Sequence, residues 1–102
     1  MYSVGGAEFF NAATNYEEGV WDTAEGQKVF EILGKLAEYT HPSTPAQANN
    51  EDFTQNQQLV LDNKAIFMPN GTWIVGEMAE APRAEGFKWG MTALPAVEAG
   101  GA

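Results

Sequence analysis

Residues 24–39 constrain the fold most strongly, because their apolar side chains recur at helical spacing. One face of such a helix carries Val29, Ile32, Leu33, Leu36 and Ala37. Apolar residues spaced in this way are typical of an amphipathic helix. Asp22, with Glu25 three residues later, resembles a capping box that starts the helix. Pro42 and Pro45 follow it, and residues before proline avoid helical dihedrals, so the sequence predicts a helix over 24–39 and then an extended linker.

Length and composition indicate a folded chain that is either one domain or a piece of one. The chain has 102 residues, and 44% of them are hydrophobic, which is more apolar material than disordered chains contain. Fourteen acidic residues against five basic ones give a net charge of −9. This charge repels phosphate backbones and leaves no basic stripe, so we expect no nucleic-acid partner.

The rest of the chain predicts further elements of an α/β fold. Asn50 or Glu51 can open a second helix that ends near Asn63, with one face formed by Phe53, Gln57, Val60 and Leu61. Residues 65–68 and 87–93 read as short strands, and residues 73–79 as a strand or, preferably, a short helix. Residues 1–22 are expected to be irregular with at most a short helix, and residues 98–102 frayed. The expected core consists of Ile32, Leu33, Leu36, Phe53, Val60, Phe67, Trp89 and Met91.

The candidate site is the turn that follows residues 65–68. Pro69, Asn70 and Gly71 interrupt the apolar run, and Thr72 and Trp73 come directly after them. A Trp beside an amide and a hydroxyl can cover the C–H face of a sugar while its polar neighbours bind the hydroxyl edge. Asn-Gly between two apolar runs is also a strong hairpin signal, in which Trp73 would be an ordinary cross-strand residue.

Two further interpretations of the polar residues receive less support. Asn70-Gly71-Thr72 fits the N-glycosylation acceptor pattern, which matters only in a eukaryotic secretory setting. His41, the single histidine, lacks partners at metal-ligand spacing, and the close carboxylate pairs have no matching nucleophile or pocket. The chain has no cysteine and no phosphate-binding glycine motif. We therefore expect neither enzymatic activity nor a metal or organic cofactor.

The order of these segments resembles the extracellular sugar-binding proteins of ABC importers. The resemblance rests on the helix VFEILGKLAEY at 29–39, the proline-rich linker, the run DNKAIFM at 62–68, the turn NGTW at 70–73 and the strand WGMTALP at 89–95. It extends from about Gly5 to Val97 and covers the middle of the second, C-terminal lobe of these two-lobed proteins. Thr72 departs from the pattern, because a member of the family has Pro there.

The resemblance implies a fold and a function. It implies a partial α/β lobe with about three helices and two or more short strands, within a longer parent protein. Trp73 matches the residue that stacks on a sugar ring, and Asn70, Gly71 and Thr72 match the turn that shapes the cleft. The parent would capture a mono- or oligosaccharide outside the cell or in the periplasm, as a lipoprotein that delivers it to a membrane permease.

The resemblance also implies limits on the chain as given. Its N-terminus has neither a basic region nor an apolar stretch of the kind that marks an export signal. One lobe fragment would not bind sugar tightly, and its exposed lobe interfaces could lead to self-association. The alternative is a stand-alone, non-catalytic interaction domain in which Trp73 and Trp89 are core or partner-contact residues.

Overall fold

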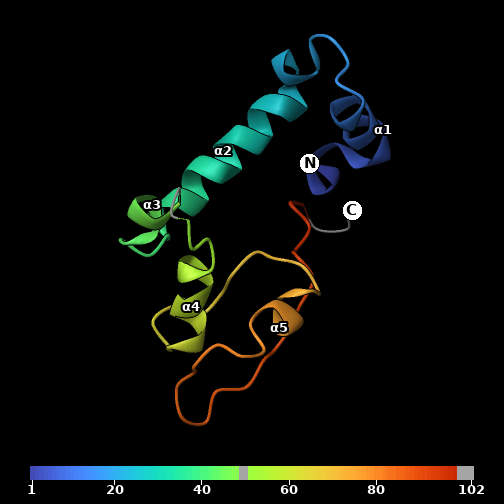
Figure 1. Ribbon diagram of the computed structural model, residues 1–102. Helices are drawn as coiled ribbons and strands as arrows, with labels where there is room; N and C mark the ends of the chain where they lie inside the picture. Colours follow the sequence, from blue (N-terminus) through green and yellow to red (C-terminus); the bar gives the residue numbers. More distant parts are fainter. Residues whose placement is uncertain (49–50, 99–102) are drawn as a thin grey trace. The chain divides into compact units, whose positions relative to one another are not determined.

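The computed structural model describes residues 1–48 and 51–98, and helices account for 48% of these residues. They are α1 (Tyr2–Thr14), the 3-10 helix η1 (Val20–Asp22), α2 (Ala24–Glu38), α3 (Thr44–Gln47), α4 (Gln55–Leu61) and α5 (Ile74–Glu77) (Figure 1). Contacts divide the chain into two compact units. The first contains Met1–Thr40 and the segment from Ala93 onward, and the second contains His41–Thr92.

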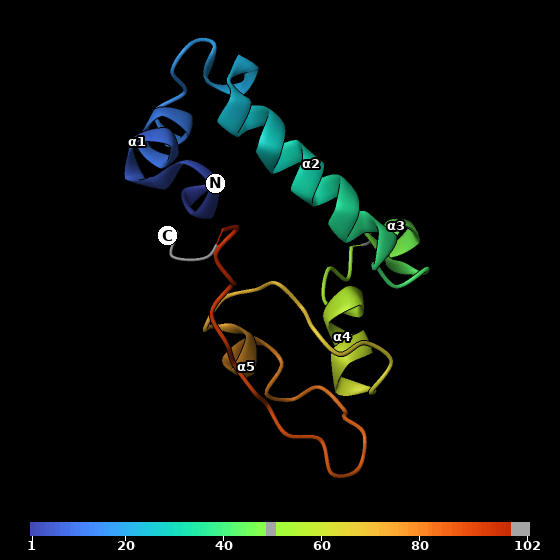
Figure 2. The same ribbon diagram turned by 180° about the vertical axis from the view of Figure 1, so that it is seen from behind.

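The expected α/β fold is wrong, because the described residues form helices and no strands. Residues 65–68 run as irregular chain in the open loop between α4 and α5 (Figures 1 and 2). In this segment Ile66 is 85% exposed and Phe67 is 80% exposed. A strand needs a neighbour that accepts and donates its backbone hydrogen bonds, and no described segment pairs with this one.

Residues 87–93, the second expected strand, show the alternation of a strand only at their start. Phe87 and Trp89 are half-buried and lie edge to face, with ring centroids 5.1 Å apart, while Lys88 between them is exposed. Met91 is 65% exposed, so the alternation does not continue, and the backbone has no partner strand in the described chain. Alternation specifies an extended backbone and leaves the partner unspecified.

The N-terminal segment is more ordered than the sequence predicts. α1 occupies most of residues 1–22, where irregular chain was expected, and it bends at Gly6, whose φ is 66°. A glycine adopts this left-handed dihedral without strain, so the chain turns there and continues into the second part of α1. The core of this unit consists of Phe9, Ala13 and Val20, with Ala12 and Val29 packed against it.

The long helix α2 confirms the prediction of a helix over 24–39, since it ends only one residue earlier. Its N-cap, however, is Thr23 and not Asp22. Thr23 Oγ1 accepts a hydrogen bond from Gly26 N at 3.1 Å and donates one to Val20 O at 2.7 Å. One hydroxyl thus caps α2 and also joins it to η1.

Removing this cap should destabilise the first unit. We expect Thr23→Ala to lower the free energy of unfolding by about 1 kcal/mol, because a backbone N–H at the start of α2 loses its acceptor. Asp22→Ala should have a smaller effect, since Asp22 does not cap the helix. Chemical denaturation followed by helical circular dichroism measures both. An equal or larger effect of Asp22→Ala would contradict the observed cap.

The apolar face of α2 is only partly covered. Near its start, Trp21 lies edge to face with both Phe9 and Phe30, at centroid distances of 5.9 and 5.8 Å. Farther along the same helix, Leu33 and Leu36 are about half exposed. The predicted core is therefore largely wrong. Five of its members are exposed, namely Leu33, Leu36, Phe53, Phe67 and Met91, whereas Ile32, Val60 and Trp89 are half-buried.

In the second unit, the segment expected as an extended linker contains the short helix α3. Pro45 lies in its first turn, where a missing N–H costs nothing. α4 starts later than the predicted second helix and ends near the predicted position, while Asn50, one of its two expected starting residues, lies outside the described residues. Asn56 Nδ2 donates to Thr44 O at 3.3 Å, which ties α4 to α3.

The core of the second unit joins α4 to α5. Leu61 is completely buried against Ile74 and Met78, and four half-buried residues pack around them, namely Met68, Ala81, Phe87 and Trp89. The backbone of the following loop is also attached to α4, since Ala84 N donates to Leu61 O at 2.8 Å. The position of α5 therefore depends mainly on two side chains of its own.

Two isoleucines test this core. Ile74 is 4% exposed and Ile66 is 85% exposed, although both belong to the second unit. We expect Ile74→Ala to destabilise the unit by about 2 to 5 kcal/mol, because it leaves a cavity beside Leu61. Ile66→Ala should change stability by less than about 0.5 kcal/mol. Denaturant titration gives both values, and similar losses would mean that Ile74 is not a core residue.

Candidate functional site

Trp73 lies where the chain turns into α5. It is the N-cap residue of that helix, and its side chain is 66% exposed. Ile74 N donates to Gly71 O at 3.2 Å, and Glu77 N donates to Trp73 O at 3.0 Å. This confirms the preferred prediction of a short helix within residues 73–79, and the indole at its start is exposed. The alternative hairpin is not formed by the described residues.

Gly71 provides the surface on which the indole rests. A Cβ atom at this position would overlap the six-membered ring of Trp73. The ring therefore lies directly against the Gly71 α-carbon, an approach that no other residue type permits without a shift of the ring. The sequence predicted a cleft-shaping turn at Gly71 but not this contact.

Two polar side chains flank the indole along the chain. Asn70 and Thr72 are both exposed, and Asn70 Oδ1 accepts a hydrogen bond from Gly71 N at 2.8 Å. All four predicted site residues thus lie in one surface turn. The turn offers a flat apolar face, a side-chain amide and a hydroxyl.

The scaffold under the turn is held by polar contacts as well as by the core. Gln57 Nε2 of α4 donates to Glu77 Oε2 of α5 at 3.0 Å. At the other end of α5, Arg83 Nη2 donates to Met78 O at 2.9 Å and to Ala79 O at 3.0 Å. The cation thereby adds hydrogen bonds to carbonyl groups at the C-terminal end of the helix, where basic side chains are favourable. None of these contacts uses the Trp73 side chain, which remains available to a ligand.

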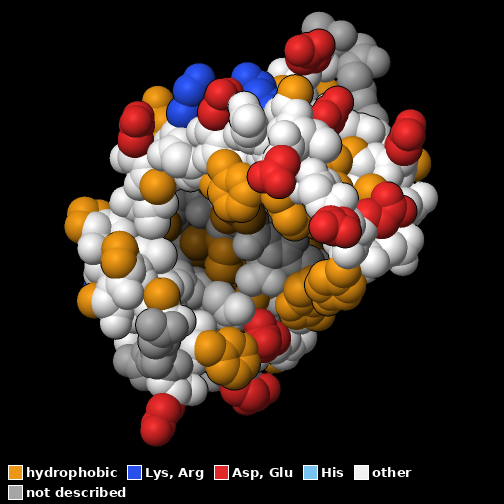
Figure 3. All heavy atoms as spheres, turned by 90° about the horizontal axis from the view of Figure 1, so that it is seen from above, with side chains coloured by type: hydrophobic (Ala, Val, Ile, Leu, Met, Phe, Trp, Pro, Cys, Tyr) orange, Lys and Arg blue, Asp and Glu red, His pale blue; other side chains and the backbone are white. Residues whose placement is uncertain are grey.

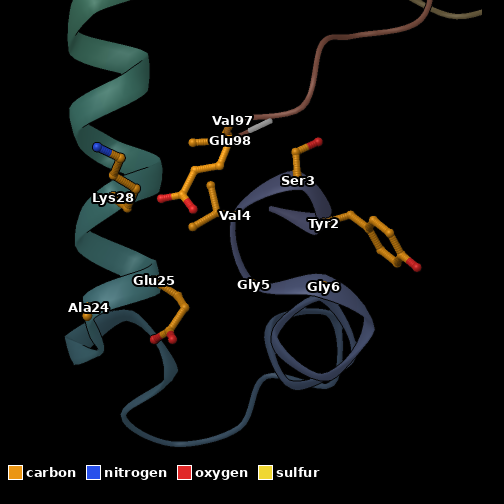
Figure 4. Close-up of a pocket in the computed structure, with 10 residues that line it drawn as sticks. All are labelled: Tyr2, Ser3, Val4, Gly5, Gly6, Ala24, Glu25, Lys28, Val97 and Glu98. Carbon is orange, nitrogen blue, oxygen red and sulfur yellow. The ribbon is translucent and has the colours of Figure 1, made fainter. Parts of the chain in front are cut away.

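Apart from this turn, a hollow lies in the first unit, at the bend of α1. Its volume is about 600 Å³, and Figure 4 shows the bend at Gly5 and Gly6 facing the first turns of α2. Glu25, Lys28 and Glu98 supply its charges, while the Tyr2 ring points away from them in the figure. Lys28 Nζ already pairs with Glu31 at 3.5 Å. The polar groups that line this hollow do not converge on a single point, so we assign the hollow no role.

The remaining charged groups are dispersed. Acidic side chains are scattered among hydrophobic ones on the face shown in Figure 3. Within residues 1–48 and 51–98, no three His, Cys, Asp or Glu side chains could hold a metal ion. His41 Nδ1 is hydrogen-bonded to Ser43 Oγ at 2.8 Å, a local contact within the turn before α3. In the same described ranges, no helix has the length and apolarity of a bilayer span.

No protein-family model, curated protein or solved structure matches this chain. A function for the turn is therefore inferred from its own residues and from the order of motifs in the sequence.

The contact between Gly71 and the indole can be tested by substitution. We expect Gly71→Ala to displace the ring and to shift the Nε1–H resonance of Trp73 in nitrogen–proton correlation spectra, with little change in melting temperature. Gly76→Ala is the matched control, because a Cβ atom there meets nothing within 4 Å. A Trp73 resonance that moves equally in both variants would contradict the contact.

Proposed function

We propose that residues 70–73 form a carbohydrate-binding surface, non-catalytic, in which Trp73 stacks on a sugar ring. The observation that carries the proposal is the exposed indole, which is fixed against Gly71 and flanked by Asn70 and Thr72. Ile74 and Met78, which are buried nearby, form the core of this unit with Leu61, so the core does not need the exposed indole.

Sugar rings suit such a surface because they combine an apolar C–H face with a rim of hydroxyl groups. Stacking of an aromatic pair contributes about 0.5 to 1.5 kcal/mol beyond area burial, and a sugar face should gain a similar amount. The amide of Asn70 and the hydroxyl of Thr72 can each donate to or accept from a sugar hydroxyl. The indole would then supply affinity, and the two polar side chains would supply orientation.

The parent of this surface would be a longer sugar-binding protein of an ABC importer, located outside the cell or in the periplasm and delivering sugar to a membrane permease. Support comes from the order of motifs in the sequence and from the amount of exposed apolar surface. Leu33 and Leu36 on α2, and Ile66 and Phe67 before the turn, are all exposed. Apolar groups in such numbers usually contact another lobe or protein.

A second candidate function is a stand-alone, non-catalytic interaction domain, favoured by the exposed Leu33 and Leu36 on α2, through which the chain would self-associate.

The sugar-binding proposal can be tested on the chain itself. Glucose, galactose, mannose and their disaccharides are titrated while the indole resonances are followed by nuclear magnetic resonance. We expect at least one sugar to shift the Trp73 signals, with weak affinity on the order of millimolar, because a single exposed wall leaves the other face of the sugar in water.

Variants at two exposed aromatic residues provide the specificity control. Trp73→Ala should weaken binding roughly tenfold or more, since about 1.4 kcal/mol corresponds to a factor of ten, and the backbone amide resonance of Gly71 reports binding in this variant. Phe67→Ala should leave binding unchanged, although Phe67 is even more exposed than Trp73. Binding that survives Trp73→Ala, or an absence of shifts with every sugar, would remove the turn as the site. Sedimentation on the same samples reports any self-association.

A further inference from the structure

Asn70 and Gly71 form the one Asn-Gly pair in the sequence, and the structure holds their reactive groups together. We propose that Asn70 is a site of spontaneous covalent modification: the Gly71 amide nitrogen attacks the Asn70 side chain, and the asparagine becomes aspartate or isoaspartate. The inference concerns the chemistry of the chain itself and does not depend on a sugar ligand.

The geometry places the attacking nitrogen beside its target carbon. Gly71 N lies 2.8 Å from Asn70 Oδ1, and Oδ1 is bonded to Cγ, the carbon that is attacked. This hydrogen bond holds the side-chain amide next to the nitrogen that attacks it, so the two reacting groups are oriented toward each other before ring closure. The absence of a side chain on Gly71 lets the backbone rotate toward ring closure.

The environment of the pair also permits the reaction. Asn70 is exposed to solvent and Gly71 is half-buried, so water and hydroxide have access to the turn that contains both amide groups. Gly71 N donates to no backbone carbonyl among the described residues. When it attacks, only its hydrogen bond to Asn70 Oδ1 has to break, and no helical hydrogen bond is lost. The indole of Trp73 covers the α-carbon of Gly71, while Pro69 and Thr72 on either side are exposed.

The reaction balances with water alone. Hydroxide removes the proton from Gly71 N, the nitrogen forms a bond to Cγ, and the bond from Cγ to Nδ2 breaks. Nδ2 takes a proton from water and leaves as ammonia, and a five-membered succinimide remains. Water then adds to one of the two ring carbonyls. Cleavage of the bond from nitrogen to Cγ gives aspartate, and cleavage at the main-chain carbonyl gives isoaspartate.

Other exposed asparagines lack this arrangement. After Asn63, Lys64 N donates to Leu59 O at 2.8 Å, and after Asn15, Tyr16 N donates to Ala13 O at 3.3 Å. In both cases the attacking nitrogen would have to give up a backbone hydrogen bond, and the residue that carries it has a side chain. Asn63 therefore serves as an internal control in the same molecule. Asn49 and Asn50 lie outside the described residues.

The product would alter the surface of the turn. Either product replaces a neutral amide with a carboxylate, and the net charge becomes more negative than −9. Isoaspartate also inserts one more carbon atom into the main chain between residues 70 and 71. Because the indole rests on Gly71, this insertion should move Trp73.

The test follows the full chain during incubation at neutral and mildly alkaline pH. Peptide mass spectrometry detects the exchange of the amide nitrogen for oxygen, and isoaspartyl methyltransferase labels the isoaspartate product. We expect modification at Asn70 to exceed that at Asn63 roughly tenfold or more and to accelerate with pH, because hydroxide starts the reaction. Asn70→Gln should abolish it, and Gly71→Ala should slow it.

A comparison with the unfolded chain isolates the role of the structure. In urea, where the geometry is lost, Asn70 should react no faster than in the folded chain. Protection of Asn70 by folding, or equal rates at Asn70 and Asn63 in the folded chain, would overturn the proposal. The Trp73 indole resonance in the modified protein reports whether the ring has moved.

Discussion

The packing of Ile74 and Met78 against Leu61 is the interaction on which the exposed turn depends. α5 is only four residues long, and a helix of that length does not form alone in water, because nucleation costs more than its few hydrogen bonds return. Burial of each of these side chains contributes about 1.5 to 3 kcal/mol. This contribution fixes the first turn of α5, and with it the backbone at residues 70–73. The Trp73 side chain can therefore be exposed without loss to the core.

Helix positions could be predicted from the sequence where the periodic pattern was long. The fifteen residues of α2 were located to within one residue. The helix expected within residues 73–79 is α5, although its four residues carry no such pattern. The irregular conformation of residues 65–68 could not be predicted, since a short apolar run does not reveal whether a partner strand exists. The predicted core residue Phe53 is exposed, whereas Leu59 and Leu61 are buried, for a related reason. Periodicity identifies the apolar face of a helix, and the neighbouring segments decide which part of it is covered.

The proximity of the four candidate site residues follows from the sequence, but their geometry does not. Asn70, Gly71, Thr72 and Trp73 are consecutive, so their proximity follows from the sequence. The contact between the indole and Gly71 depends on the rotamer of Trp73, which a linear pattern does not specify. The sequence signal that could have indicated this contact is the spacing of Gly71 and Trp73, which stand two residues apart at the start of a helix. The hydrogen bond from Gly71 to Asn70 was likewise outside the reach of motif analysis.

The proposed sugar binding and the proposed modification of Asn70 rest on the same properties of the turn. A sugar ligand would use an exposed amide beside the indole, and the contact between the indole and Gly71 requires a residue without Cβ at position 71. Together these requirements place an exposed Asn directly before a Gly. A sugar that bound the Asn70 amide would draw Oδ1 away from Gly71 N and would exclude water from the amide. Occupation of the turn and modification of Asn70 would therefore oppose each other, because both would use the same amide group.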